Sequence, residues 1–293
     1  AIGVGGVDRF TALFQPLTFA ALRVPSPGGP CPHTGRPAPS LDEALATLER
    51  TLDAHAHETA AVVMEPLVQA AAGIWVHPRG FLRGVADLCR RHDVLLILDE
   101  VATGFGRTGT LFACEQEDVA PDFLCLAKGL TAGYLPMAAT LTTGRVWDAF
   151  LGPHGDRRTF FHGHTYGGNP LAAAVGLASL DVFRDERVLE SLPPKIARLR
   201  AHVERIAALD HVGAVRQCGL MAGIDLVADK ASGAAYPWEE RRGMRACRAA
   251  RDHGALLRPL GDVVVIMPPL CVSLDEIDHL AAAAEAGIRA ATA

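Results

Sequence analysis

The chain has 293 residues, of which 49% are hydrophobic and 21% are charged, and its formal net charge is −5. This length allows one large domain with its own core or two packed domains. The basic residues are interleaved with 33 acidic ones, whereas a nucleic-acid-binding protein would usually concentrate positive charge in a patch. The longest apolar runs, such as residues 263–267, are too short to span a bilayer. The composition therefore predicts neither a nucleic-acid partner nor a membrane protein.

The N-terminal residues and the cysteines indicate the compartment. The opening AIGVGGVDRF has no basic segment followed by an apolar one, so no signal peptide is predicted. No two cysteines form a C-x-x-C pair, and several lie in apolar stretches, where cysteine behaves as a small hydrophobic residue. We expect a cytoplasmic protein without disulfides or structural zinc. The seven cysteines are Cys31, Cys89, Cys114, Cys125, Cys218, Cys247 and Cys271.

The first half of the chain is predicted to alternate helices with buried strands. The proline-rich segment 25–39 is an irregular loop that ends at the capping box Ser40-Leu-Asp-Glu43, and this box predicts a helix to about residue 55. Another helix is expected over residues 78–92. Apolar runs of strand type occupy residues 60–64, 94–98, 123–127 and 137–141. Such a pattern indicates a parallel sheet buried on both faces, with functional groups at the carboxyl ends of its strands.

The second half is predicted to change character. After Asn169-Pro170, a helix rich in Ala and Leu is expected to reach about residue 184. Residues 212–227 are typical of strands with glycine turns. A helix over residues 239–253, a strand over 263–267 and a last helix opened by the capping box 273–276 follow. We therefore predict a large α/β domain over residues 1–184 and a smaller α+β domain over residues 185–293.

Two ionisable residues follow neighbouring strands of the predicted sheet. Asp99 ends the apolar run VLLIL, and Lys128 ends the run FLCLA. The chain contains only three lysines, the others being Lys195 and Lys230, so an amine has been kept at this strand end where arginine would not serve as a nucleophile. Burial there would lower the pKa of the Lys128 amine, which Schiff-base chemistry requires.

This pair suits the cofactor pyridoxal 5′-phosphate (PLP). A PLP site needs a lysine for the Schiff base and a carboxylate for the protonated ring nitrogen, which lets the ring accept electrons. It also needs amides and hydroxyls around the phosphate and an apolar side chain against the ring. Lys128 and Asp99 meet the first two needs, and Val101 is the candidate for ring packing.

Long motifs around these residues resemble one enzyme family. The segments LDEVATGFGRTG and LAKGLTAGYLP resemble the signature of class III (subgroup II) aminotransferases of PLP fold type I. The segments EPLVQAAAG, FFHGHTYGGNPLA and LRPLGDVVVIMPP are similar to the branch of this class that acts in biotin synthesis. The resemblance covers essentially the whole chain, in order. It implies the fold of the class, a mostly parallel large domain followed by a smaller α+β domain.

The resemblance also implies residue roles. Lys128 is expected to be the Schiff-base lysine, which also contacts the substrate, and Asp99 is expected to bind the ring nitrogen. His164 and Thr165 are expected to contact the cofactor phosphate across the interface of a homodimer. The family pattern assigns the remaining substrate contacts to Gly163, which lines the pocket, and to Arg258, which binds a carboxylate. Arginine suits that task because its planar fork matches a carboxylate.

The implied reaction is a ping-pong transamination. An amino donor converts PLP to pyridoxamine phosphate, which then aminates 7-keto-8-aminopelargonate (KAPA) to 7,8-diaminopelargonate, with Lys128 carrying the proton. The donor is expected to be S-adenosylmethionine, although some relatives use lysine, and the sequence does not decide between them. Ala102 stands where many relatives carry Gln or Met, which favours the biotin branch over enzymes that act on ornithine or 4-aminobutyrate.

The chain begins at Ala1 rather than Met, so we expect that an N-terminal part of the protein precedes it. In the family, that part supplies a Gly-Ser phosphate loop and an aromatic residue that stacks on the ring. We therefore expect the 293-residue chain alone to bind PLP loosely and to be a poor enzyme.

Other functions remain open at this point. Residues 104–109, GFGRTG, match the G-x-G-x-x-G pattern of dinucleotide-binding proteins, although two acids would then lie beside the pyrophosphate. The strand VLLILDE is similar to the Walker B strand of ATPases, but no G-x-x-x-x-G-K-[ST] is present. Another class III ω-aminotransferase and a non-enzymatic binding module are further alternatives. His162 and His164 form a weak metal signal, and we predict no metal site.

Overall fold

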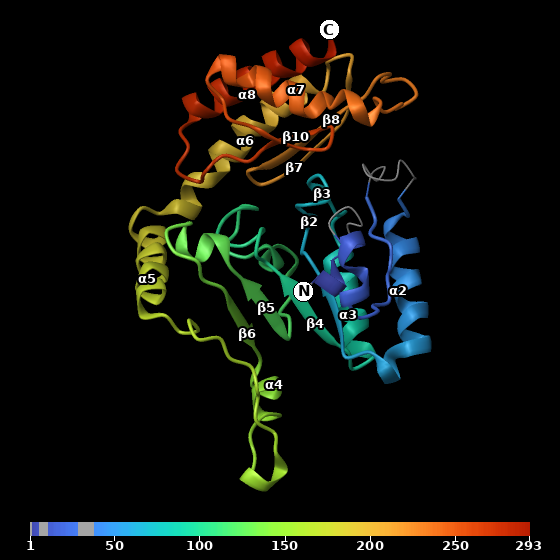
Figure 1. The fold of residues 1–293 in the computed structure, drawn as a ribbon, viewed down its shortest axis with the longest axis vertical. Coiled ribbons are helices and arrows are strands. Elements are labelled where there is room, and N and C mark those ends of the chain that lie inside the picture. Colours follow the sequence, from blue (N-terminus) through green and yellow to red (C-terminus); the bar gives the residue numbers. More distant parts are fainter. Residues whose placement is uncertain (1, 6–10, 29–37) are drawn as a thin grey trace.

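The computed structural model describes residues 2–5, 11–28 and 38–293. Figure 1 shows two sheet-centred units, with a long helical connection between them. The first unit contains a four-stranded sheet, and the second contains another four-stranded sheet with three helices beside it. A small two-stranded ribbon, β2 (Val68–Gln69) and β3 (Trp75–Val76), lies where the first unit faces the second.

The first sheet has the strand order β1-β4-β5-β6. Strand β1 (Ala61–Met64) runs parallel to β4 (Leu95–Asp99), which runs parallel to β5 (Phe123–Leu126). Helices α2 (Leu41–His55) and α3 (Phe81–Arg91) share a buried apolar core with β4. The helix and strand positions predicted from the sequence for residues 40–127 are therefore confirmed to within a few residues.

The fourth strand differs from the expected pattern. Strand β6 (Ala139–Thr142) pairs antiparallel with β5, and its side chains are largely exposed. Only about a dozen residues separate the two strands, and no helix that could carry the chain back across the sheet lies between them. The sheet is thus mostly parallel, with an antiparallel edge strand that is not buried on both faces.

Capping boxes begin two helices, as the sequence predicts. At α2, the Ser40 hydroxyl accepts the Glu43 amide at 3.3 Å, and the Glu43 carboxylate accepts the Ser40 amide at 2.8 Å. At α8 (Leu274–Thr292), Ser273 and Glu276 repeat this pairing at 3.2 and 2.7 Å. Each box satisfies amides that the first helical turn leaves unpaired.

Two helices connect the units. Helix α5 (Pro170–Asp185) begins at Asn169, whose side chain caps the Leu171 amide, and α6 (Val188–Ile206) continues into the second unit. The sequence analysis did not predict α6, which contains Pro193 and Pro194 near its beginning. Proline removes a helical hydrogen bond, but the buried Leu and Val side chains of α6 compensate by packing into the second core.

The second sheet is antiparallel, with the order β7-β8-β10-β9. Its core also includes side chains of α6, α7 and α8. The bounds are β7 (Val212–Cys218), β8 (Met221–Leu226), β9 (Arg258–Leu260), β10 (Val263–Ile266) and α7 (Arg242–Ala249). The strands and helices predicted over residues 212–292 are confirmed.

The short helices of the described ranges are α4 (Gly144–Asp148) and 3-10 turns at Ile2–Val4, Ala12–Leu17, Ala56–Glu58, Ala113–Glu117, Lys128–Thr131, His154–Asp156, Trp238–Glu240 and Ala250–His253.

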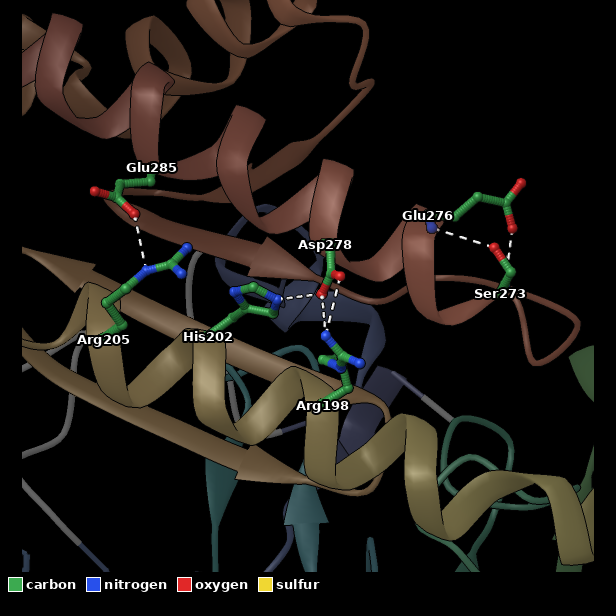
Figure 2. A network of polar contacts seen from close by, with 7 residues as sticks. All are labelled: Arg198, His202, Arg205, Ser273, Glu276, Asp278 and Glu285. Atoms are coloured by element: carbon green, nitrogen blue, oxygen red, sulfur yellow. Dashed lines mark hydrogen bonds and ion pairs between the residues drawn. The ribbon is translucent and has the colours of Figure 1, made fainter.

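A row of polar contacts joins α6 to α8 on the outside of this core. Asp278 accepts hydrogen bonds from Arg198 at 3.1 Å and pairs with His202 at 2.5 Å, while Arg205 lies 3.3 Å from Glu285 (Figure 2). The hydrogen bond from His202 holds the pKa of the Asp278 carboxyl below its usual value. The second unit thus joins its helices through both apolar and polar contacts.

None of the helices in the described ranges is long and apolar enough to cross a membrane.

Candidate active site

Three ionisable side chains follow the three parallel strands of the first sheet. Met64 of β1 pairs with Leu98 of β4, so the next residues along these strands, Glu65 and Asp99, lie side by side. Asp99 in turn pairs with Cys125 of β5, and Lys128 follows Cys125 by three residues. The sequence predicted the juxtaposition of Asp99 and Lys128. It did not single out Glu65, although the same signal, an acid directly after an apolar strand, was present there.

The turn after β4 orients Asp99. Its Oδ1 accepts the Val101 amide at 3.0 Å, and no other hydrogen bond to this carboxylate is present in the described part of the chain. Asp99 is half-buried, with Oδ2 not engaged by a described side chain or amide. The local turn therefore holds the carboxylate in place and leaves an oxygen available for a cationic partner.

The neighbouring acid, Glu100, has a structural task. It is fully buried, and its carboxylate accepts the Thr103 hydroxyl at 2.7 Å and the amides of Ala113 and Cys114 at 2.9 Å each. A buried carboxylate needs such partners to offset the loss of hydration. The Asp-Glu pair thus divides its roles: Glu100 anchors the following loop, and Asp99 faces the strand ends.

The backbone of Lys128 is unusual. Its φ is +41°, in the left-handed region that few non-glycine residues adopt, and the lysine begins a short 3-10 turn. The next residue, Gly129, lies so close to Phe105 that a Cβ there would come within 2.6 Å of the Phe105 Cβ. Strained backbone of this kind is found preferentially at functional sites.

The environment of Lys128 differs from the expectation in one respect. The apolar run before Lys128 predicted a buried amine, whereas the Lys128 side chain is exposed. The chain enters a 3-10 turn at Lys128, and the following Gly129 packs against Phe105. Desolvation of this amine is therefore not provided by the described residues of one chain.

Glu65 is the acid that the sequence analysis missed. Its Oε2 accepts the Ala70 amide at 3.0 Å. Burial raises the pKa of the Glu65 carboxyl to about 7; the hydrogen bond from Ala70 and the charge of Lys128 lower it, and the charge of Asp99 raises it. The charges of Asp99 and Lys128 thus both act on Glu65 at the carboxyl edge of the sheet.

The GFGRTG loop is packed rather than open. Phe105 is buried and forms edge contacts with the Phe112 ring at a centroid distance of 5.7 Å. Arg107 donates to the Pro268 carbonyl at 2.5 Å, and its own carbonyl accepts the Leu220 amide at 3.0 Å. Burial lowers the pKa of the Arg107 guanidinium. The loop thus fastens the first unit to the second. The amides of Gly104, Gly106 and Gly109 all donate to backbone carbonyls of the same turn, so they are not free to cradle a phosphate, which weakens the dinucleotide alternative.

The other predicted residues lie in two places. Gly163, His164 and Thr165 are exposed in the segment between α4 and α5, which extends away from the body of the first unit in Figure 1. The described contacts of His164 are local, since its Nδ1 accepts the Tyr166 amide at 3.2 Å. Within one chain, no hydrogen bond or ion pair among the described residues joins this segment to Asp99 or Lys128.

Arg258 begins β9 in the second unit, where it pairs in register with Val265. Its side chain is exposed, and it forms no ion pair with any acid in the described ranges. By contrast, Arg216 in the same sheet is bound to Asp225 and to the carbonyl of Gly73. A guanidinium without an internal partner is available to bind a carboxylate from outside the chain.

No group of three or more His, Cys, Asp or Glu side chains in the described ranges is arranged to hold a metal ion.

The fold is that of a PLP-dependent transferase, and the chain belongs to the class III aminotransferase family, whose sequence profile matches residues 8–286. Among curated proteins, the adenosylmethionine-8-amino-7-oxononanoate aminotransferase of Geobacter sulfurreducens is 52% identical over all of this chain and 65% of its own length. An ω-aminotransferase of Caulobacter vibrioides is 35% identical over 95% of this chain and 63% of its own length.

Solved structures agree with this membership. A crystal structure of the adenosylmethionine-8-amino-7-oxononanoate aminotransferase of Methanocaldococcus jannaschii superimposes with a TM-score of 0.91 at 40% identity, over 99% of this chain and 64% of that chain. The ω-transaminase of Pseudomonas jessenii in complex with PMP gives a TM-score of 0.90 at 29% identity, over 99% of this chain and 65% of that one. Class III aminotransferases depend on PLP. The chain spans 54–65% of the length of the first three curated relatives.

Proposed function

We propose that the protein catalyses PLP-dependent transamination of KAPA to 7,8-diaminopelargonate, a step of biotin synthesis, with S-adenosylmethionine as the amino donor. The observation that carries the proposal is the strand register that sets Asp99 and Lys128 at adjacent carboxyl ends. The relatives named after this reaction, at 39–52% identity, support the choice of substrate.

The residues of the site fit the cofactor. When bound, PLP supplies an electron sink that stabilises negative charge on a substrate carbon. The Lys128 amine holds the cofactor and moves the proton at the substrate α-carbon. Asp99 holds the ring nitrogen in its protonated form through its available oxygen, and the Val101 side chain packs on the ring.

Substrate and phosphate are assigned to residues from other segments. Arg258 binds the carboxylate of KAPA, because its guanidinium has no partner among the described residues. Gly163 is assigned to the substrate pocket by the family resemblance, and within one chain no atom lies within 4 Å of a Cβ placed there. His164 and Thr165 contact the cofactor phosphate of a second subunit, which accounts for their exposure and for their separation from Lys128.

This arrangement requires a homodimer. Large apolar side chains are exposed throughout the stretch from β6 to α5, and a second copy of the chain would cover them. They are Leu141, Trp147, Phe150, Leu151, Phe160, Phe161, Tyr166, Leu171, Leu177, Leu180 and Val182. We further propose that residues 1–184 and 185–293 are the two domains and that the protein acts in the cytoplasm, where its thiols would stay reduced.

The proposed function is tested by Lys128→Ala in the protein as expressed from its gene. We expect loss of the visible absorption band of bound PLP and at least a thousandfold loss of KAPA amination, on the order of the effect of removing a nucleophile that no other group replaces. The control is Lys195→Ala on α6, which should retain both properties. A Lys128→Ala protein that keeps the band and the turnover contradicts the assignment.

A second candidate is an ω-aminotransferase that acts on another amine. The 35% identity to the Caulobacter enzyme and the TM-score of 0.90 to the Pseudomonas ω-transaminase favour it. The KAPA amination assay, run on the wild-type protein, decides between the two functions. Amination of KAPA with S-adenosylmethionine or lysine as donor supports the first, and turnover of simple primary amines without KAPA amination supports the second.

A further inference from the structure

Glu65 is an acid at a position where neither a salt bridge nor the local backbone structure depends on a carboxyl group. It follows β1 directly, and the β1–β4 register sets it beside Asp99 at the carboxyl edge of the sheet. Its side chain is half-buried, and its Oε2 accepts the amide of Ala70 at 3.0 Å. No Arg, Lys or His forms an ion pair with it among the described residues. An amide or alcohol at this position could also accept the Ala70 hydrogen bond, so the turn alone does not call for a carboxyl.

Two charged groups act on Glu65 from the elements packed against it. The carboxylate of Asp99, at the end of β4, disfavours a second negative charge, and the amine of Lys128, after β5, favours one. Burial is the larger influence and raises the pKa of Glu65 to about 7. The charge of Glu65 can therefore change near neutral pH, and it depends on the charges of Asp99 and Lys128.

We propose that Glu65 is a positioning residue of the active site. Its carboxyl is protonated while Asp99 carries the only negative charge of the three groups, and it releases the proton to solvent when Lys128 becomes positively charged. This inference rests on the proposed function, because it gives the lysine and the aspartate their roles. Glu65 thereby keeps the net charge of the strand ends nearly constant. The coupling is reciprocal: an ionised Glu65 favours positive charge on Lys128.

The first test needs no cofactor. Infrared difference spectra between the wild type and Glu65→Gln report the protonated carboxyl of Glu65 as a function of pH. Glutamine keeps an oxygen for the Ala70 amide, so the turn should be preserved. We expect a carboxyl band that disappears near pH 7 in the wild type. A carboxyl that is already ionised at pH 5 overturns the proposal.

The neighbouring groups supply a directional test in the same cofactor-free protein. Asp99→Asn removes the repelling charge and should move the Glu65 transition to lower pH. Lys128→Ala removes the attracting charge and should move it to higher pH, so the two variants shift it in opposite directions. The control is Glu204→Gln on the exposed face of α6, which should leave the transition unchanged. Absence of both shifts would show that Glu65 is not coupled to the site.

With PLP bound, the visible band of the cofactor reports protonation at its linkage to Lys128. Glu65→Gln should lower the pH midpoint of this spectral change by about one unit, as expected for loss of one nearby negative charge. Glu65→Asp should restore part of the shift, because it restores a carboxyl. An unchanged midpoint overturns the proposal. Failure of the proposed function gives a different result, namely a Lys128→Ala protein that retains the PLP band while Glu65 still titrates in the cofactor-free protein.

Discussion

The stretch from β6 to α5 and the C-terminal unit differ in how far their apolar side chains are exposed. Trp147, Phe161 and Leu177 in the first region are 60%, 89% and 65% exposed. In the second unit, Leu199, Ile224 and Ile277 are at most 1% exposed, and α6, α7 and α8 cover one continuous core with the antiparallel sheet. Both regions are rich in apolar residues, so composition does not explain the difference.

The contrast fits the proposed homodimer: the C-terminal unit would be complete within a single chain, whereas the stretch from β6 to α5 would be incomplete until a second copy covers it. A run of exposed aromatic and aliphatic side chains of this extent is rare on a protein that acts alone, and it marks a surface for a partner. The same region carries Gly163, His164 and Thr165, which lie apart from Lys128 within one chain. A second copy of the chain, as proposed, would bury the apolar surface and bring a phosphate to these residues.

The largest effect is expected from breaking the incomplete region. The double variant Phe161→Glu, Leu177→Glu inserts charges where a second subunit would pack, and burial of an unpaired charge is very costly. We expect the protein to sediment as a monomer and to lose its KAPA amination almost entirely, because His164 and Thr165 would no longer reach a partner's site. Analytical ultracentrifugation and the amination assay measure the two effects.

The matched control for this variant is Met244→Glu on α7, a partly exposed apolar residue of the complete unit. It should remain a dimer with normal turnover. A wild-type protein that sediments as a monomer, or a double variant that stays dimeric and active, would rule out the proposed interface.

A smaller effect is expected in the folded core of the complete unit. Leu199 of α6 is 0% exposed, so Leu199→Ala should lower the free energy of unfolding by about 2–5 kcal/mol. Leu171→Ala on α5, at a position that is 70% exposed, removes the same atoms and should change the free energy of unfolding by less than about 0.5 kcal/mol in the dissociated protein. Urea unfolding of both variants in the monomeric background measures the difference. Equal costs would show that the exposure of α5 does not describe the protein in solution.

The smallest effect concerns a buried imidazole of the first unit. His77 follows β3, is buried against the edge of the Phe81 ring, and has no hydrogen-bond partner for either ring nitrogen among the described residues. Burial lowers the pKa of His77 to about 4. Between this value and the ordinary histidine value, the unfolded chain binds a proton that the folded chain does not. The free energy of unfolding should therefore fall as the pH decreases through this window, by at most about 1.4 kcal/mol per unit.

His77→Leu should remove this slope, and the measurement is the difference between variant and wild type in urea unfolding at pH 7 and pH 5. The difference is needed because Glu65, whose pKa is raised, contributes a slope of opposite sign over a similar range. The exposed His57→Leu should leave the wild-type slope intact. An unchanged slope in His77→Leu would mean that the imidazole is hydrated or paired in solution.

Local signals in the sequence account for elements of both units. The capping boxes at Ser40 and Ser273 were visible as residue patterns because they depend on four consecutive residues. Asp99 and Lys128 were found because parallel strands gather their carboxyl ends at one edge, a rule that needs no side-chain contact. The same rule applied to Glu65, but an acid before a proline is common in turns, and its sequence position alone did not distinguish it.

Other features depend on contacts that no local pattern contains. Helix α6 was not predicted because Pro193 and Pro194 argue against a helix, and only burial of its apolar face in the second core overrides that preference. The antiparallel direction of β6 follows from its short connection to β5. The exposure of Lys128 was not predicted either, and the turn that contains it packs Gly129 against Phe105, a residue more than twenty positions earlier in the sequence.

The sequence by itself therefore determined the family, the order of most elements and the two residues on which the chemistry is proposed to depend, because long motifs and strand ends are local properties. Only the tertiary structure decided which acid shares the edge with Asp99, why Glu100 is buried rather than catalytic, and which surface is left uncovered. Those outcomes depend on desolvation and on Coulomb interactions between groups distant in sequence, and both are set by three-dimensional proximity.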